Sequence, residues 1–246
     1  MSTLLEICCG SIDDARQAQA GGAQRIELCS ALFLGGLTPS IGTLQYARRQ
    51  LSIPIMAMVR PRGGGFRYTD AEFATMEYDA EVFIAKGADG LVFGILKADG
   101  SIDVARTKRL REIAGNKQTV FHRAFDVTPD PFRALDELVN LGITRILTSG
   151  QQETVPEGAE LIRQLIEYAG SRIEILPGGG IRPYNVADVV ARTGCAGVHL
   201  TAFKTVSDPS TQRHPNVTFG GSLQPPEDSF VMTDAALVRQ IAEKLR

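Results

Sequence analysis

The sequence contains no tryptophan, only three histidines and four cysteines, and almost no excess of charge of either sign. The net charge is -2 and the sequence has no basic block, so we expect no binding to nucleic acid or to a membrane surface. No run approaches the ~20 apolar residues of a membrane span, and Glu6 interrupts the only apolar run near the N-terminus. The cysteines show no disulfide spacing, so we expect reduced thiols and a cytoplasmic location.

What the sequence does contain is ordinary for a globular protein. Its hydrophobic content is 43% and its charged content 22%. A chain of 246 residues is long enough for one large α/β domain that buries its own core. We therefore expect one domain over residues 1–246, without a linker.

Short apolar runs alternate with helical patterns along most of the chain. Several runs are continuously apolar, as in strands that are covered on both faces of a parallel sheet. The alternation predicts an α/β fold, a single (β/α)8 TIM-type barrel; an open doubly wound sheet is the alternative, because periodicity does not show closure. The eight predicted strands are 4–9, 25–29, 54–60, 90–95, 119–125, 144–148, 172–177 and 196–201.

Helix-start signals precede several of the intervening segments. Ser11 is a predicted N-cap, and Thr69 with Glu72 forms a predicted capping box. Thr38 and Thr128, each followed by proline, are predicted to open two further helices.

The segment 203–231 follows the eighth predicted strand and is rich in Ser, Thr, Pro, Asn and Gly. Loops of this length in a compact domain are usually functional or disordered. On a barrel, a loop after a strand lies on the catalytic side, so we predict a long irregular loop that serves as a lid or as an arm for self-association.

Polar side chains gather where the predicted strands end, which is where barrel enzymes have their sites. In the fifth strand, alternation places His122 and Asp126 on one face and Arg123 on the other. The candidate site residues are Glu6, Cys8, Glu27, Cys29, Arg60, Arg62, His122, Arg123, Asp126, Ser149, Gly178, Gly179, Gly180, His199 and Thr201.

Two thiols are expected to lie close together inside the barrel. Glu6 and Cys8 share one face of the first strand, and Glu27 and Cys29 share one face of the second. Neighbouring strands are ~4.8 Å apart, so inward-facing thiols can approach each other. Two thiolates suit Cu(I), although buried cysteines often only fill space.

The carboxylates of Glu6 and Glu27 need compensation if they are buried, which Arg60 or the protons of His122 could supply. Two carboxylates in one pocket also push their pKa values apart, which creates an acid and a base. Glu6, Glu27, His122 and Asp126 are therefore candidate catalytic residues. The structural alternative is an ion-pair network that only stabilises the barrel.

A second group of residues is suited to an anion. Guanidinium groups bind carboxylate or phosphate in bidentate fashion, and glycine-rich loops after strands seven and eight of barrels commonly hold phosphate. The candidate anion-binding residues are Arg60, Arg62, Arg123, Ser149, Gly178, Gly179, Gly180, His199 and Thr201.

Seven short motifs resemble the CutC copper homeostasis family, in that family's order from residue 5 to about residue 200. The last part of the chain matches only loosely. The motifs lie at residues 5–8 (LEIC), 25–29 (RIELC), 35–40 (GGLTPS), 60–64 (RPRGG), 121–126 (FHRAFD), 147–150 (LTSG) and 177–180 (PGGG).

This resemblance implies a cytoplasmic TIM-type barrel, a homodimer, and copper ligands at the positions of Cys8 and Cys29. The sequence departs from the family where Gly65 replaces the usual Asp and where Leu200 and Thr201 follow His199. The main functional hypothesis is therefore a copper homeostasis protein that binds Cu(I) through thiols. The alternative is an enzyme that uses His/Glu acid-base chemistry on a small anionic metabolite, a class that includes phosphorylated metabolites.

Overall fold

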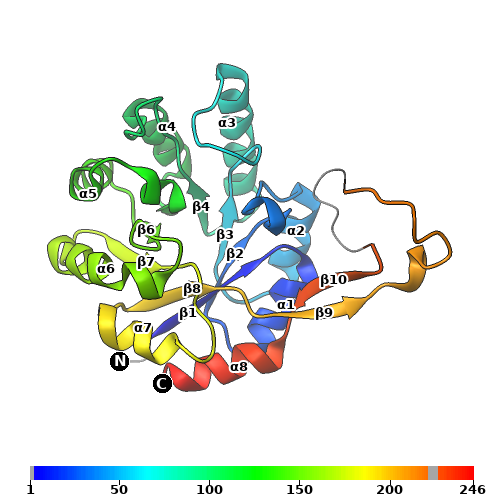
Figure 1. Cartoon of the computed structure of the whole chain (residues 1–246). Coiled ribbons are helices and arrows are strands. Elements are labelled where there is room, and N and C mark those ends of the chain that lie inside the picture. Colours follow the sequence, from blue (N-terminus) through cyan, green and yellow to red (C-terminus); the bar gives the residue numbers. More distant parts are fainter. Residues whose placement is uncertain (1–2, 221–226) are drawn as a thin grey trace.

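The computed structural model describes residues 3–220 and 227–246. Eight parallel strands follow one another in the order β7-β6-β5-β4-β3-β2-β1-β8, and a parallel bridge between Gly178 and His199 joins β7 to β8 (Figure 1). The predicted TIM-type barrel is therefore confirmed. Its strands are β1 Leu4–Cys9, β2 Arg25–Leu28, β3 Ile55–Met58, β4 Gly90–Phe93, β5 Gln118–Phe121, β6 Arg145–Thr148, β7 Glu174–Pro177 and β8 Gly197–Leu200.

The helices surround this sheet on the outside (Figure 1). None of them, within the described ranges, is long and apolar enough to cross a membrane. Their bounds are α1 Ile12–Gly21, α2 Ile41–Gln50, α3 Asp70–Ala85, α4 Val104–Ala114, α5 Pro131–Asn140, α6 Val155–Ala169, α7 Val186–Thr193 and α8 Ala235–Lys244.

Two of the four helix-start predictions are confirmed and two are wrong. Ser11 caps α1, and Thr69 with Glu72 forms a complete capping box on α3. The helix after β2 begins later than predicted because the Thr38 hydroxyl accepts a hydrogen bond from the backbone N–H of Arg60, and Ser40 is the N-cap. Likewise the Thr128 hydroxyl donates to a nearby carbonyl, and α5 is capped by Asp130.

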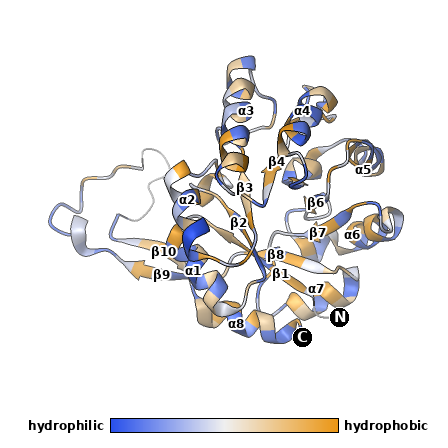
Figure 2. Ribbon diagram, turned by 180° about the vertical axis from the view of Figure 1, so that it is seen from behind, coloured by the Kyte–Doolittle hydropathy of each residue, from blue (hydrophilic) through white to orange (hydrophobic). Residues whose placement is uncertain are grey.

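The alternation of side chains along the strands produces two separate cores. Residues such as Leu5, Ile7 and Ile26 point outward and pack against the apolar faces of the helices, whose polar faces lie outside (Figure 2). A second cluster fills the barrel interior, as expected for a small barrel. It consists of Cys8, Cys29, Met56, Met58, Val92, Val120, Leu147 and Leu176.

The fifth strand is shorter than predicted. It ends at Phe121, and a 3-10 helix, η2 Arg123–Val127, follows directly. The strict alternation predicted for His122, Arg123 and Asp126 is therefore wrong beyond His122. The cause is local: His122 acts as the N-cap of η2, and its ring nitrogen accepts from the backbone N–H of Ala124.

Part of the segment 203–231, predicted to be irregular, forms a two-stranded antiparallel sheet of β9 Phe203–Ser207 and β10 Ser229–Thr233. This hairpin, called the arm below, extends away from the barrel (Figure 1). Residues 221–226 of the segment lie outside the described residues. The end of the arm is attached to α1 because Asp14, which is buried, accepts a hydrogen bond from the backbone N–H of Thr233.

The close approach of α6 to the end of β6 requires glycine. A Cβ atom at Gly158 would lie 2.0 Å from the carbonyl oxygen of Ser149. We expect Gly158→Ala to lower the free energy of unfolding by about 2 kcal/mol or more, since backbone must move to relieve the overlap. Urea denaturation measures this change. Gly65→Ala is the control, because nothing lies within 4 Å of its Cβ position, and equal losses for both variants would contradict the packing argument.

Candidate functional site

The two thiols predicted to face inward lie together inside the barrel. Cys8 on β1 is paired in register with Glu27 on β2, and Cys29 directly follows β2. Oε2 of Glu27 lies 3.3 Å from Sγ of Cys8 and 3.4 Å from Sγ of Cys29. One ligand atom from each of the three residues falls within 4.8 Å of the other two, so the cluster could hold a metal ion.

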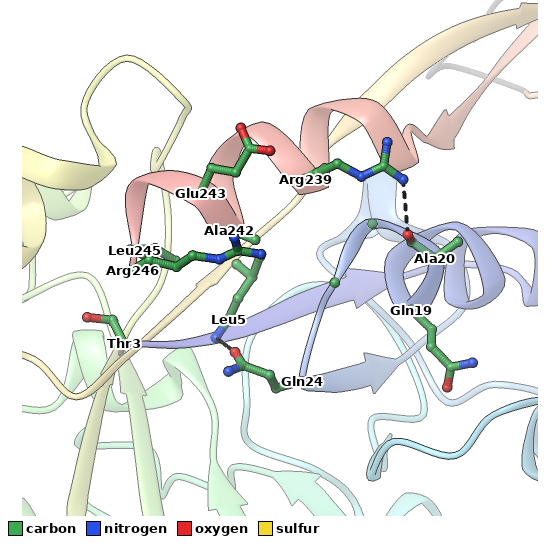
Figure 3. Close-up of a pocket in the computed structure, with 12 residues that line it drawn as sticks. Thr3, Leu5, Gln19, Ala20, Gln24, Arg239, Ala242, Glu243, Leu245 and Arg246 are labelled. Carbon is green, nitrogen blue, oxygen red and sulfur yellow. Dashed lines mark hydrogen bonds between the residues drawn. The ribbon is translucent and has the colours of Figure 1, made fainter. Parts of the chain in front are cut away.

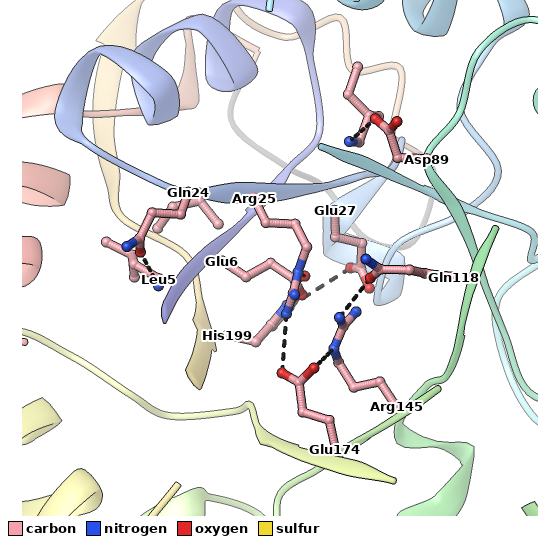
Figure 4. Close-up of polar contacts among 12 residues, drawn as sticks. Leu5, Glu6, Gln24, Arg25, Glu27, Asp89, Gln118, Arg145, Glu174 and His199 are labelled. Atoms are coloured by element: carbon pink, nitrogen blue, oxygen red, sulfur yellow. Dashed lines mark hydrogen bonds and ion pairs between the residues drawn. The ribbon is translucent and has the colours of Figure 1, made fainter. Parts of the chain in front are cut away.

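His199 connects this cluster to the lower part of the barrel interior. Its Nδ1 lies 2.7 Å from Oε1 of Glu6, and its Nε2 lies 3.8 Å from Oε2 of Glu27 (Figure 4). Burial lowers the pKa of His199, but the charge of Glu27 and hydrogen bonds to Cys8 and Glu6 outweigh burial and raise it well above its usual value. His199, predicted as an anion-binding residue, is thus an imidazolium held between two carboxyl groups.

The protons of the cluster are unequally distributed. A hydrogen bond from Cys29, together with the nearby imidazolium of His199, lowers the pKa of Cys8 to about 5. The hydrogen bond with Cys8, followed by burial, raises the pKa of Cys29. Burial and the charge of Cys8 raise the pKa of Glu27. These shifts favour the thiolate form of Cys8 and the protonated forms of Cys29 and Glu27.

Glu6 is neutralised by residues that the sequence analysis did not single out. An ion pair with Arg25 and the bond with His199 hold its carboxylate (Figure 4). Burial raises the pKa of Glu6, but the bond with His199 and the charge of Arg25 lower it to about 2. The expectation that Arg60 or His122 compensates Glu6 is wrong, because Arg25 is its neighbour in register across β1 and β2.

Arg25 belongs to a larger network at the amino-terminal ends of the strands. Its Nη2 lies 3.5 Å from Oε1 of Glu174, and Nε of Arg145 lies 2.8 Å from Oε2 of the same carboxylate (Figure 4). Arg145 also donates to Gln118. The structural alternative, an ion-pair network in the barrel, thus accounts for Glu6, while Glu27 faces the thiols.

A cavity of about 700 Å³ opens above the cluster at the carboxyl ends of the strands. Cys8, Glu27 and His199 form part of its lining, and apolar side chains from the loops and the arm form much of the remainder. Of the predicted site residues, those that line the cavity are Cys8, Glu27, Arg60, His122, Arg123, Asp126, Gly178, Gly179, Gly180, His199 and Thr201. Arg182, which the sequence analysis missed, lines it as well.

Asp126 lines the cavity, but its carboxylate is occupied by the protein. It accepts hydrogen bonds from the hydroxyls of Thr148 and Ser149 and from the backbone N–H of Gln151, and it pairs with Arg123. Such a carboxylate holds the loop after β6 rather than offering a free base.

Arg123 lies between this loop and the three glycines after β7. Its Nη2 donates to the hydroxyl of Ser149, and a Cβ atom at Gly179 would lie 3.1 Å from its Nη1. Gly179 and Gly180 have φ values of 123° and 71°, which only glycine adopts easily. Arg123, Ser149 and the glycines are therefore brought together as predicted, although Ser149 is not in the cavity lining.

Arg62 is not brought to the site. Its guanidinium pairs with Glu72 at the start of α3 and donates to the carbonyl oxygens of Gly65 and Arg67. Its position in the sequence, two residues after Arg60, suggested a common role, but the loop directs the two guanidinium groups to different partners.

A second cavity, of about 350 Å³, lies between α1 and α8 at the opposite end of the barrel (Figure 3). Gln19, Gln24 and Arg239 are among the residues that line it. None of the buried, unpartnered polar atoms found in the described residues belongs to its lining. The amino-terminal end of a barrel contributes to stability rather than to chemistry, so we do not assign this cavity a function.

The chain is similar along most of its length to proteins of one family. The model of the CutC family matches residues 3–204. A CutC family protein of Treponema denticola is 54% identical over 226 residues, which are 92% of this chain and 92% of that protein. The human copper homeostasis protein cutC homolog is 43% identical over 238 residues, covering 97% and 87%. The crystal structure of CutC from Streptococcus agalactiae matches with a TM-score of 0.78 and 38% identity, covering 81% of this chain and 98% of that one.

The buried Glu6–Arg25 pair leads to a prediction about stability and its pH dependence. Arg25→Met leaves Glu6 with one fewer compensating charge, so we expect a loss of about 3–5 kcal/mol in the free energy of unfolding. In the native wild type Glu6 stays ionised down to about pH 2, whereas in the unfolded chain it takes up a proton near its ordinary pKa of 4.5. Acidification from pH 4.5 to 2 therefore removes the contribution of this pair to stability.

We accordingly expect the difference in stability between wild type and Arg25→Met to narrow as the pH falls through this window. Denaturant unfolding at several pH values measures it. Arg16→Met is the matched control, since Arg16 forms an exposed pair with Asp13 and its loss should cost less than about 1 kcal/mol. A difference that stays constant between pH 4.5 and 2 would show that Glu6 is not the group involved.

Proposed function

The chain belongs to the CutC family, and from this premise we propose that it is a copper homeostasis protein that binds Cu(I) through Cys8 and Cys29. The observation that carries the proposal is the convergence of both Sγ atoms on one oxygen of Glu27 inside the barrel. Thiolates are the ligands that Cu(I) prefers, and buried thiols without a disulfide partner are suited to hold it.

The other residues of the cluster support this choice of metal. Met58 lines the cavity and belongs to the same interior cluster as both thiols, so its thioether is available as a further soft ligand. Oε1 of Glu27 is buried without a hydrogen-bond partner among the described residues. One oxygen beside two sulfur atoms is a poor set for Mg²⁺ or Ca²⁺, which require several oxygen ligands.

The thiolate of Cys8 suits the cluster to a monovalent cation such as Cu(I). Cys8 is already a thiolate because of its neighbours, so it provides a ligand without losing a proton. Binding through Cys29 requires release of its proton, and the raised pKa of Glu27 makes that carboxyl group a second source of protons. Copper binding should therefore strengthen as the pH rises.

The cavity offers a route for the metal to the cluster. Cys8 is 8% exposed and lines the cavity, whereas Cys29 is 1% exposed and lies behind it. Cys8 is therefore the thiol that an incoming ion meets first. This arrangement differs from an exposed Cys-x-x-Cys site, and it favours storage or sensing over rapid transfer to a partner.

The alternative, an enzyme acting on a small anion, is favoured by one observation, a cavity of about 700 Å³ with a few polar groups in a mostly apolar lining. Its acid-base part has less support, because no hydrogen bond or ion pair joins His122 to Glu6 or Glu27 in the described residues.

The cytoplasmic location expected from the sequence also stays a prediction.

Titration with Cu(I) in competition with a strong chelator tests the proposed function. We expect wild type to bind one ion per chain and Cys8→Ser/Cys29→Ser to bind about 100-fold more weakly or not at all. Affinity of the wild type should rise by about tenfold per pH unit for each proton released. Cys195→Ser is the control, since Cys195 is buried outside the cluster. Unchanged binding by the double variant would overturn the proposal.

The predicted homodimer has its own test. Phe219 and Phe230 of the segment 203–231 are 76% and 50% exposed, and Val217 and Val231 of the same segment are exposed as well. Several exposed apolar side chains on one segment support its use in self-association. We expect sedimentation equilibrium to give a dimer for wild type and a monomer for Phe219→Ser/Phe230→Ser. Replacing Tyr184, which is 84% exposed on the barrel, by Ser is the control. A wild-type monomer would contradict the prediction.

A further inference from the structure

The cavity contains buried polar atoms that the copper proposal does not use. Polar side-chain atoms that are buried without a hydrogen-bond partner are uncommon in folded proteins, so each one calls for an explanation. The described residues contain several such atoms. Three of the residues that carry such atoms line the cavity, namely Glu27, Arg60 and His122. Glu27 belongs to the thiol cluster, so Arg60 and His122 remain to be explained.

His122 presents a hydrogen-bond donor for which residues 3–220 and 227–246 provide no acceptor. Its Nδ1 accepts from the backbone N–H of Ala124 at 3.1 Å, so Nδ1 carries no proton and the neutral ring is protonated at Nε2. The residue is 4% exposed, and Nε2 has no partner among the described residues. Burial, together with the charge of Arg60, lowers the pKa of His122 to about 3, so the ring stays neutral at physiological pH.

Arg60 is a buried cation that has no counter-ion in the described part of the chain. It is 6% exposed, and its Nη atoms donate to the carbonyl oxygens of Leu34, Gly36 and Gly64 at 2.8 to 3.0 Å. None of the ion pairs found in the described residues includes Arg60, and its Nε has no acceptor. Burial of an unpaired charge is costly, which makes this wall of the cavity receptive to an anion.

The two groups lie on the same wall because one aromatic ring packs against both. Phe66 lies with its ring centroid 5.4 Å from Cζ of Arg60 and 5.0 Å from the ring centroid of His122. Phe33, Leu147 and Phe203 add apolar surface to the same cavity. A volume of about 700 Å³ with few polar groups among apolar ones is typical of sites for small organic molecules.

We propose that Arg60 and His122 form a binding subsite for the carboxylate or phosphate group of a small organic anion with an apolar body. An oxygen of the anion accepts a hydrogen bond from Nε2–H of His122, and the guanidinium of Arg60 neutralises its charge. The apolar body lies against the aromatic and aliphatic side chains of the cavity. This subsite goes beyond the proposed copper function and does not require the metal.

The test uses the full, copper-free chain and three probes of similar size: benzoate, phenyl phosphate and the neutral benzyl alcohol. The chain has three histidines, so a ¹⁵N-histidine NMR spectrum resolves His122 once it is assigned by substitution. We expect at least one anionic probe to shift the Nε2 resonance of His122 at millimolar concentration, while benzyl alcohol has no such effect. A response to benzoate alone or to phenyl phosphate alone identifies which headgroup the subsite takes.

Substitutions of His122 separate the effect of its N–H donor from the effect of its side-chain shape. His122→Phe removes the donor and should weaken binding by about tenfold in calorimetry, whereas His122→Gln can keep an N–H near the position of Nε2 and should retain most of the affinity. Arg60→Met should weaken anionic probes and leave benzyl alcohol unaffected. His214→Phe, at an exposed histidine of the segment 203–231, is the matched control and should bind like wild type.

Thermal unfolding confirms that each variant is folded before binding is measured. The proposal is overturned if no anion shifts the His122 resonance, or if folded His122→Phe binds the anions as tightly as wild type does. Equal binding of benzyl alcohol and benzoate would also overturn it, since Arg60 would then contribute nothing to selectivity.

Discussion

The arrangement of charged side chains inside the barrel depends on one buried carboxylate, that of Glu6. A charge in this position is tolerated because the neighbouring strands direct Arg25 and His199 toward it from either side. The bond to Glu6 fixes the orientation of His199, and the second nitrogen of His199 then faces Glu27. The pair of Glu6 with His199 in the lower interior therefore positions the imidazole that helps to lower the pKa of Cys8 in the cluster above it.

The two ends of the barrel use arginine differently. At the amino-terminal ends of the strands, Arg25 and Arg145 share Glu174, so positive and negative charges are matched within the protein. At the carboxyl ends, the guanidinium of Arg60 is bound, within the described part of the chain, only by carbonyl oxygens, which leave its net charge unbalanced. A matched network stabilises the fold, whereas an unmatched charge beside a cavity is available to a ligand. This contrast distinguishes the structural from the functional end without reference to any relative.

The sequence predicted the thiol cluster correctly because the side-chain period of a strand is short and strict. Cys8 and Cys29 share the inward parity with Glu6 and Glu27, and β1 and β2 are neighbours both along the chain and in the sheet. The same reasoning failed for Asp126, because the fifth strand ends at Phe121 and a cap interaction of His122 starts a new turn. Arg62 was assigned to the site because it shares a loop with Arg60, but its guanidinium pairs with the helix-capping residue Glu72.

The sequence by itself determined the alternation of strands and helices, the inward-facing residues of the first two strands and the family resemblance, because hydrophobic periodicity and short motifs are local properties. Only the tertiary structure decided which charged side chains inside the barrel pair with each other. The pairing of Glu6 with His199 joins residues 193 positions apart, and it exists only because the closed barrel makes β8 the neighbour of β1. Closure also brings the loops after several strands to one opening, where the unpaired donors of Arg60 and His122 lie on one wall. Periodicity carries no information about closure, and so the sequence alone could not predict these contacts.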